Sequence, residues 1–227
     1  MSMVSNLDLI RRIPLFSLLT DEQARRIADA VAKRRFRRGE AVVEQGQKGN
    51  ALFILLNGRA RVVVGDDKGR EVFLAVLEAG DFLGEMSLID HEPHSATVRA
   101  EVQTDMLVLG QPEFSRCVHD SAALAYSVMH GLVKRLRAAD RQIESLALLD
   151  VHGRVARALL EASEVIDGRS VVRSRVHRQD LAKAIGASRE MVSRVMRHLE
   201  AQGVIQTQAD GSLILRQERA GGATMRG

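Results

Sequence analysis

The chain has 227 residues, with 45% hydrophobic and 27% charged residues, which is enough apolar material for a packed core and excludes a disordered chain. Aromatic residues make up only 3%, so stacked aromatic platforms for single-stranded nucleic acid are not expected. The formal net charge of +4 falls entirely in residues 150–227, because residues 1–149 carry as many basic as acidic side chains. This distribution predicts a polyanionic partner for the second part of the chain.

The chain has a single cysteine, Cys117, which excludes an internal disulfide and a zinc or iron–sulfur centre held by several thiolates. The N-terminal residues lack the apolar stretch of a secretory signal, so we expect a reducing, cytoplasmic location. The longest obvious apolar run, residues 51–56, is too short to cross a bilayer, and no membrane partner is expected.

The first predicted helix begins after Thr20, where the order Thr-Asp-Glu-Gln matches a capping box and apolar residues follow at helical spacing. From about Arg38 to Leu109, short β-rich runs alternate with glycine turns. This pattern predicts an antiparallel sandwich or barrel. The predicted strands are 41–44, 51–56, 60–64, 72–77, 96–102 and 106–109.

A short helix is predicted at Pro112, and a long helix without proline over residues 120–149. Apolar residues of the long helix recur at alternating steps of three and four, which is typical of a coiled-coil seam between two parallel copies of the chain. The alternative is a core helix packed on strands of its own chain. The predicted seam residues are Met129, Leu132, Leu136, Ala139, Ile143 and Leu146.

A second domain is predicted over residues 150–217. It begins with a helix that contains Val155, Ala158 and Leu159, and continues with an extended segment over 169–176. Two closely spaced helices follow, at 178–185 and 189–201. Asp210-Gly211 then marks the turn of a hairpin. Residues 218–227 are predicted to form a disordered tail.

The two closely spaced helices predict a helix-turn-helix. Gly186 suits the turn because glycine adopts positive φ at little cost, and Ser188 suits the N-cap of the second helix. The predicted buried residues of that helix are Met191, Val192, Val195, Met196 and Leu199. The residues left facing outward are Arg189, Glu190, Ser193, Arg194 and Arg197. Such a face is suited to base edges in the major groove, since arginine pairs with guanine and a carboxylate accepts from cytosine; the alternative is a solvated face.

Four segments together resemble the CRP/FNR family of bacterial transcription regulators. They are "FRRGEAVVEQG" from Phe36, "GEMSLIDHEPHSATVRA" from Gly84, "LLDVHGRVARALL" from Leu148 and "SREMVSRVMRHLE" from Ser188. The resemblance covers nearly the whole chain. It implies an α+β fold, with an antiparallel β-barrel of the jelly-roll (double-stranded β-helix) type over residues 1–119, a dimerisation helix over 120–149 and a winged helix-turn-helix over 150–217.

The resemblance also implies the partners. These are a second copy of the chain, RNA polymerase, and palindromic double-stranded DNA with TGTGA-like half-sites. A dimer would place its two reading helices roughly 34–36 Å apart, on successive turns of DNA. The DNA-contacting residues implied are Ser188, Arg189, Glu190, Ser193 and Arg194.

By the same resemblance, a nucleotide effector would bind at Gly84, Glu85, His94, Ser95 and Ala96. Glu85 would bind a ribose 2′-hydroxyl and Ser95 the cyclic phosphate. Arg135 would orient Glu85 and link the pocket to the dimerisation helix.

This sequence departs from the family pattern at the phosphate, where His94 stands in place of an arginine. Arginine is always charged, whereas histidine is mostly neutral at pH 7. Ala139 and Asp140 also replace the hydroxyl residues that hold adenine. Three alternatives therefore remain: another nucleotide such as a cyclic dinucleotide, no effector, or cyclic AMP in a changed pocket.

The pair His91 and His94 is not expected to bind a metal, because the two residues lie three apart with Pro93 between them and leave two tetrahedral positions unfilled. The sequence contains no nucleophile–base set and no phosphate-binding loop, so an enzyme is not predicted. A competing class is a cyclic-nucleotide-binding regulatory subunit whose second domain docks on a protein.

Overall fold

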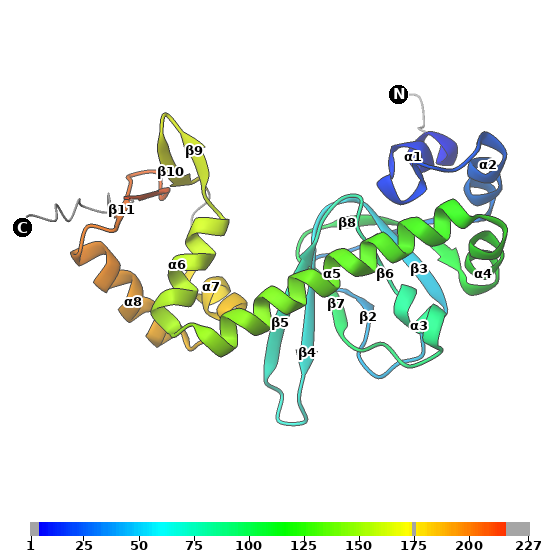
Figure 1. Ribbon diagram of the computed structural model, residues 1–227. Coiled ribbons are helices and arrows are strands. Elements are labelled where there is room, and N and C mark those ends of the chain that lie inside the picture. The colour runs from blue at the N-terminus through cyan, green and yellow to red at the C-terminus, as the bar shows by residue number, and fades with distance from the viewer. Residues whose placement is uncertain (1–4, 174–175, 217–227) are drawn as a thin grey trace, which may run out of the picture. The chain divides into compact units, whose positions relative to one another are not determined.

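The computed structural model describes residues 5–173 and 176–216 (Figure 1). The chain divides into two compact units, Met1–Ala138 and Ala139–Gly227. The predicted tail at 218–227 lies outside the described residues. Helix α5 (Ala122–Leu148) continues from the first unit into the second.

The strands of the first unit form two antiparallel four-stranded sheets, in the orders β1-β8-β3-β6 and β2-β7-β4-β5. The mixed α and β class with antiparallel pairing is confirmed, although among the described strands no ladder closes the two sheets into one barrel. The strands are β1 (Ala32–Phe36), β2 (Ala41–Val43), β3 (Ala51–Asn57), β4 (Ala60–Gly65), β5 (Glu71–Leu77), β6 (Phe82–Leu83), β7 (Thr97–Ala100) and β8 (Thr104–Gly110).

Strand β3 is buried on both faces, which explains its uninterrupted apolar sequence. Leu52 and Ile54 join a core that lies between the first sheet and the helices. Phe53 and Leu55 join the other core, which also contains residues of β4 and β7 from the second sheet. The helices that cover the first core are α1 (Asn6–Arg12), α2 (Asp21–Ala30), α4 (Gln111–Asp120) and the beginning of α5, with a short 3₁₀ turn at Pro14–Phe16.

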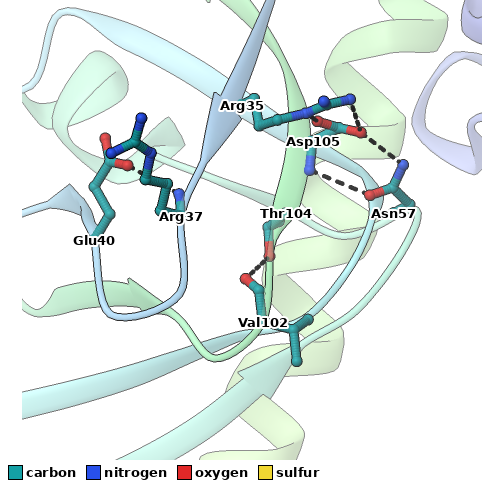
Figure 2. Close-up of polar contacts among 7 residues, drawn as sticks. All are labelled: Arg35, Arg37, Glu40, Asn57, Val102, Thr104 and Asp105. Carbon is teal, nitrogen blue, oxygen red and sulfur yellow. Dashed lines mark hydrogen bonds and ion pairs between the residues drawn. The ribbon is translucent and has the colours of Figure 1, made fainter.

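The pairing of β1 with β8 is reinforced by side chains that Figure 2 shows. Arg35 lies directly opposite Asp105 in the register, and its Nε is 2.5 Å from Asp105 Oδ1. The Nδ2 of Asn57 donates to the other carboxylate oxygen at 3.0 Å. Thr104, which is fully buried, donates its hydroxyl to the carbonyl of Val102 at 3.0 Å. Of these contacts, Arg35–Asp105 is the cross-strand pair that helps to hold the edge strand β1 in register with β8.

The second unit contains α6 (Val151–Glu161), β9 (Glu164–Ile166), β10 (Arg169–Val172), α7 (Arg178–Ile185), α8 (Arg189–Ala201), β11 (Ile205–Thr207) and β12 (Leu213–Leu215). Its strands pair as one antiparallel sheet, β11-β12-β10-β9. The three helices and the sheet enclose one core, which includes Val155, Leu181, Val192 and Leu213.

Several local expectations are confirmed. Thr20 and Gln23 form the predicted capping box of α2. Gly186 has φ 64° at the end of α7, and the Ser188 hydroxyl accepts from the backbone N–H of Met191 at 3.1 Å.

Three expectations about element boundaries and burial were wrong. The extended segment predicted over 169–176 is a strand only to Val172, and it pairs with β9, which had no sequence signal. The strand predicted over 96–102 is limited to Thr97–Ala100. Met191 was predicted to be buried but is 42% exposed, because the buried stripe of α8 begins at Val192.

Candidate functional site

Segment 84–96 contains the short helix α3 (Glu85–Asp90), which follows β6 directly. Gly84 precedes it with φ 90°, and a Cβ at this position would collide with the carbonyl oxygen of Ala51. Only glycine allows this close approach together with this backbone conformation. The tight turn places Glu85 at the first position of α3 with its side chain directed into the protein.

Glu85 is only 1% exposed. Its Oε1 accepts a hydrogen bond from Arg135 Nη1 at 2.6 Å. Its Oε2 is buried and has no hydrogen-bond partner among the described residues. Burial raises the pKa of the Glu85 carboxyl, and the Arg135 guanidinium opposes that rise only in part. An unpaired buried acceptor is costly in a folded protein, so this oxygen is suited to a donor supplied by a ligand.

Arg135 is held on α5 by contacts with Phe82 of β6. The guanidinium carbon lies 4.8 Å from the centre of the Phe82 ring, and Nη2 donates to the Phe82 carbonyl oxygen. One turn earlier, Gly131 lets the helix approach the same ring, because a Cβ there would lie 2.5 Å from Phe82 Cζ. Phe82, Gly131 and Arg135 therefore fix the position of Glu85 from outside segment 84–96.

His94 does not project freely from the surface. Its ring is half-buried, with Nδ1 3.1 Å from the hydroxyl oxygen of Ser87. Burial lowers the pKa of the His94 ring, so the neutral form is favoured. The neighbouring Ser95 is exposed and Ala96 is half-buried. The structure therefore brings Glu85 and Arg135 into contact and shows no hydrogen bond from either to His94 or Ser95.

Helix α8 presents a polar face at its N-terminal end. Arg189, Glu190 and Arg194 are exposed, and Ser193 is half-buried. Within the described part of the chain, no arginine of α7 or α8 lies within ion-pair distance of a carboxylate. Elsewhere in the second unit Arg157 pairs with Glu161, and Arg173 with Glu164. The cations on these two helices are therefore unneutralised, which favours a polyanionic partner.

Arg178 of α7 contacts α8 from the side. Its Nη1 lies 3.5 Å from the Ser193 carbonyl oxygen, which also accepts from Arg197 Nε at 3.3 Å. Arg178 and Arg189 line a hollow of about 800 Å³ between α7, α8 and the loop of the β11–β12 hairpin. This arrangement, with a helix beside a hairpin wing, is that of a winged helix-turn-helix.

Comparison with known proteins identifies both modules. Residues 33–121 match the model of the cyclic nucleotide-binding domain, and residues 153–220 match that of the Crp-like helix-turn-helix domain. The chain is 32% identical to the cAMP-activated global transcriptional regulator Vfr of Pseudomonas aeruginosa, over 76% of this chain and 84% of that one. The chain belongs to the CRP/FNR family of transcription regulators.

Two further CRP/FNR proteins cover most of the chain. It is 31% identical to the Cyclic AMP receptor protein of Thermus thermophilus, over 85% of this chain and 88% of that one. Its fold is similar to that of the c-di-GMP responsive global regulator CLP of Xanthomonas campestris, with a TM-score of 0.73, 26% identity and coverage of 87% and 100% of the two chains.

As a CRP/FNR member, the protein is a DNA-binding transcription regulator with a cyclic nucleotide-binding domain, and its relatives are regulators and not enzymes. The Crp-like helix-turn-helix overturns the competing reading of the second domain as a protein-docking module. Among the described residues, no helix is long and apolar enough to span a membrane. No cluster of three metal-binding side chains occurs in the same residues.

Helix α5 carries a stripe of exposed apolar side chains that coincides in part with the residues of the predicted seam. Met129, Leu136 and Ile143 are 55%, 63% and 64% exposed, whereas Leu132 packs partly against the core of the first unit. Val133, beside Leu132, is 47% exposed instead. Ala139 and Leu146 are also exposed. The exposed apolar stripe therefore includes Val133 in place of Leu132.

Sequence reasoning missed four residues of the candidate site: Phe82, Ser87, Gly131, and Gly49, where a Cβ would collide with Ser87 and His94. A glycine inside a long helix was the one available signal, since Gly131 lowers helix stability unless close packing requires it. The other three have no distinctive spacing, and they become recognisable only when the fold brings them next to His94 or Arg135.

Proposed function

We propose that this CRP/FNR regulator is a homodimer whose binding to DNA is controlled by a nucleotide in the first unit. The observation that carries the proposal is Glu85, a buried carboxylate with one oxygen paired to Arg135 and the other without a partner. A ribose hydroxyl is a donor of suitable size for that oxygen. A charge-assisted hydrogen bond there would contribute about 1.5–3 kcal/mol to binding.

The nucleotide would occupy segment 84–96, with Glu85 at the ribose and the exposed Ser95 at the phosphate. Gly84 and Ala96 keep the backbone close to the ligand, because neither carries a bulky side chain. The relatives support a nucleotide in general, since Vfr is described as cAMP-activated and CLP as responsive to c-di-GMP.

A cyclic dinucleotide is the effector that we favour. His94 carries no permanent positive charge where the resemblance places the phosphate of cyclic AMP, because burial favours its neutral form, so we expect cyclic AMP to bind more weakly than it would to an arginine. Asp140, which is exposed on α5, adds a negative charge on the dimerisation helix. Two alternatives remain: cyclic AMP bound in a changed pocket, and a regulator that works without a ligand.

The dimer would form through the exposed stripe of α5 (Ala122–Leu148), which lies within the dimerisation helix predicted over residues 120–149. Large exposed apolar side chains at heptad spacing are typical of a partnered helix face. The stripe consists of Met129, Val133, Leu136, Ala139, Ile143 and Leu146, and the exposed Tyr126 precedes it on the same helix.

The second unit would read palindromic DNA with TGTGA-like half-sites through Ser188, Arg189, Glu190, Ser193 and Arg194. Arg194 and Glu190 are the residue types that pair with guanine and cytosine. RNA polymerase is the protein partner that we propose.

The nucleotide is tested by isothermal titration calorimetry of the full-length protein with cyclic AMP, cyclic GMP and cyclic di-GMP. Wild type is expected to bind cyclic di-GMP, and His94→Arg to gain affinity for cyclic AMP. His119→Arg adds the same charge on the exposed side of α4 and is expected to bind as wild type does. Tight binding of cyclic AMP by wild type would overturn our choice, and absence of binding by all three nucleotides would favour a ligand-independent regulator.

A further inference from the structure

Three chain segments meet at the ring of His94. Gly49 belongs to the loop before β3, Ser87 to α3, and His94 to the loop before β7. A Cβ on Gly49 would lie 2.6 Å from Ser87 Cβ and 2.8 Å from His94 Cε1, so only glycine permits this packing. The backbone of His94 is held as well, since its N–H donates to Gln47 O and its carbonyl accepts from Gly46 N, both at 2.8 Å. The imidazole is therefore confined to one place beside Ser87.

The hydroxyl of Ser87 is a suitable partner for the ring in either protonation state. It is almost fully buried and lies 3.1 Å from His94 Nδ1. The hydroxyl can donate to Nδ1 of a neutral ring, or accept from Nδ1–H of a protonated one. A proton can thus be added to His94 without the loss of this hydrogen bond.

The charged groups around the ring do not fix its charge in advance. The loop before β3 carries Glu44 and Lys48, α3 carries Glu85 and Asp90, and the loop of the ring itself carries His91 and Glu92. Glu85 is paired with Arg135, and Asp90 accepts from the backbone N–H of Glu92. Burial, and not a neighbouring charge, lowers the pKa of the His94 ring.

We infer that a phosphate-bearing ligand binds at segment 84–96 together with a proton, which His94 takes up. The inference rests on the proposed function, because it assumes that this segment receives the nucleotide. A phosphate beside the confined ring stabilises the imidazolium. Because the backbone of His94 is held by hydrogen bonds, the ring stays beside the phosphate. His94 then provides, on binding, the positive charge that an arginine would carry permanently.

The sign of the pH effect follows from the two states. Burial places the pKa of the free ring below its ordinary value, and the anion raises it in the complex. Ligand affinity is therefore highest below the pKa of the free state. It falls as pH rises between the two pKa values and is lowest above the pKa of the complex. Each unit of difference corresponds to about a tenfold change in affinity.

A first experiment follows the ring directly, with sulfate as the probe. The Cε1–H resonance of His94, assigned by its loss in His94→Gln, is titrated with pH in sodium sulfate and in sodium chloride at equal ionic strength. We expect sulfate to raise the pKa of His94 by about one unit, and to leave His119, exposed on α4, nearly unchanged. If sulfate changes the pKa of His94 and of His119 by the same amount, the inference is overturned.

A second experiment measures proton uptake during nucleotide binding. Calorimetry with cyclic di-GMP and cyclic AMP at a pH midway between the free and sulfate-bound pKa values of His94 is repeated in buffers of different ionisation enthalpy. For a rise of about one unit, wild type is expected to take up about half a proton and His94→Arg none, with an affinity independent of pH. Nucleotide binding without proton uptake would refute the inference and leave the proposed function standing. If neither nucleotide binds, the proposed effector fails, and the sulfate titration still decides the role of His94.

Discussion

At the scale of single residues, the candidate effector site depends on one carboxylate. Glu85 is buried, and its pKa is raised because burial outweighs the nearby Arg135. A raised pKa means that the ionised form is disfavoured by folding, so Glu85 lowers stability as pH rises through its folded pKa. A residue kept in this state is more easily explained by ligand binding than by stability.

Glu85→Gln tests this explanation. The amide keeps an acceptor for Arg135 and removes the charge, so the free variant should melt within a few degrees of wild type. The nucleotide should bind about tenfold or more weakly, because a neutral acceptor replaces a charged one. Thermal melts with and without cyclic di-GMP measure both effects. An unchanged ligand-induced rise in Tm would show that Glu85 does not bind the nucleotide.

Arg194→Ala tests base reading on α8. The affinity difference between the preferred half-site and one with a single base change should shrink by about 1–3 kcal/mol. The slope of log affinity against log salt should change little, because a base contact releases no phosphate counterion. Arg197→Ala, an exposed arginine on the same helix, is the matched control. If both variants lose affinity equally for all sequences, Arg194 contacts the backbone instead.

At the scale of elements, capping and turn residues made the helices predictable. Thr20, Gly186 and Ser188 act within one or two turns of chain, so their sequence signals survive without tertiary context. Strand β1 was not predicted, since its residues Ala32–Phe36 are mostly charged and only the last is buried. It forms because all five residues pair with β8, which is distant in sequence, and Phe36 is buried in the core; the Arg35–Asp105 pair adds to this register.

The same contrast holds for the candidate site. The segment from Gly84 gave Glu85 and His94, because a motif keeps its spacing, and the resemblance as a whole implied Arg135 on the dimerisation helix. They did not give Phe82, Gly131 or Ser87, whose roles follow from packing. Leu132 shows the limit of periodicity, since a heptad pattern does not reveal which side of α5 the core already covers.

Gly131→Ala tests the approach of α5 to β6. The new methyl group would enter the Phe82 ring, and overpacking of this kind costs about 1–3 kcal/mol, against about 1 kcal/mol gained from helix propensity. We expect urea denaturation to show a net loss, and nucleotide affinity to fall as Arg135 shifts. Adding Phe82→Leu to Gly131→Ala should restore part of the lost stability and part of the lost nucleotide affinity. Gly153→Ala in α6, where the nearest atom would lie at 3.3 Å, is the control and should be nearly neutral.

Leu136→Lys tests the exposed stripe of α5. Two lysines facing each other across a seam would leave buried charges unpaired, so the variant should be monomeric at concentrations where wild type is dimeric. Sedimentation velocity measures the change. Leu18→Lys, at a residue 60% exposed and outside α5, should leave the dimer intact. A dimer that tolerates Leu136→Lys would place the interface on another surface.

At the scale of the whole molecule, one chain combines a cyclic nucleotide-binding domain with a DNA-binding domain. The first unit holds a buried acceptor suited to a sugar hydroxyl, and the second carries unneutralised arginines suited to DNA. A ligand changes DNA affinity only if it binds better to the DNA-competent state, and such coupling is typically worth about 1–3 kcal/mol. The net charge of +4 lies in the part of the chain that binds DNA.

The central claim is nucleotide-controlled, sequence-specific DNA binding, and one titration tests it most directly. Fluorescence anisotropy compares a palindromic duplex with two TGTGA-like half-sites and a scrambled duplex, at fixed salt, with and without cyclic di-GMP or cyclic AMP. We predict that the palindrome binds about a thousandfold more tightly than the scrambled duplex, and that one nucleotide changes this affinity by about fivefold or more. Equal affinity for both duplexes, or an affinity that no nucleotide alters, would contradict the account.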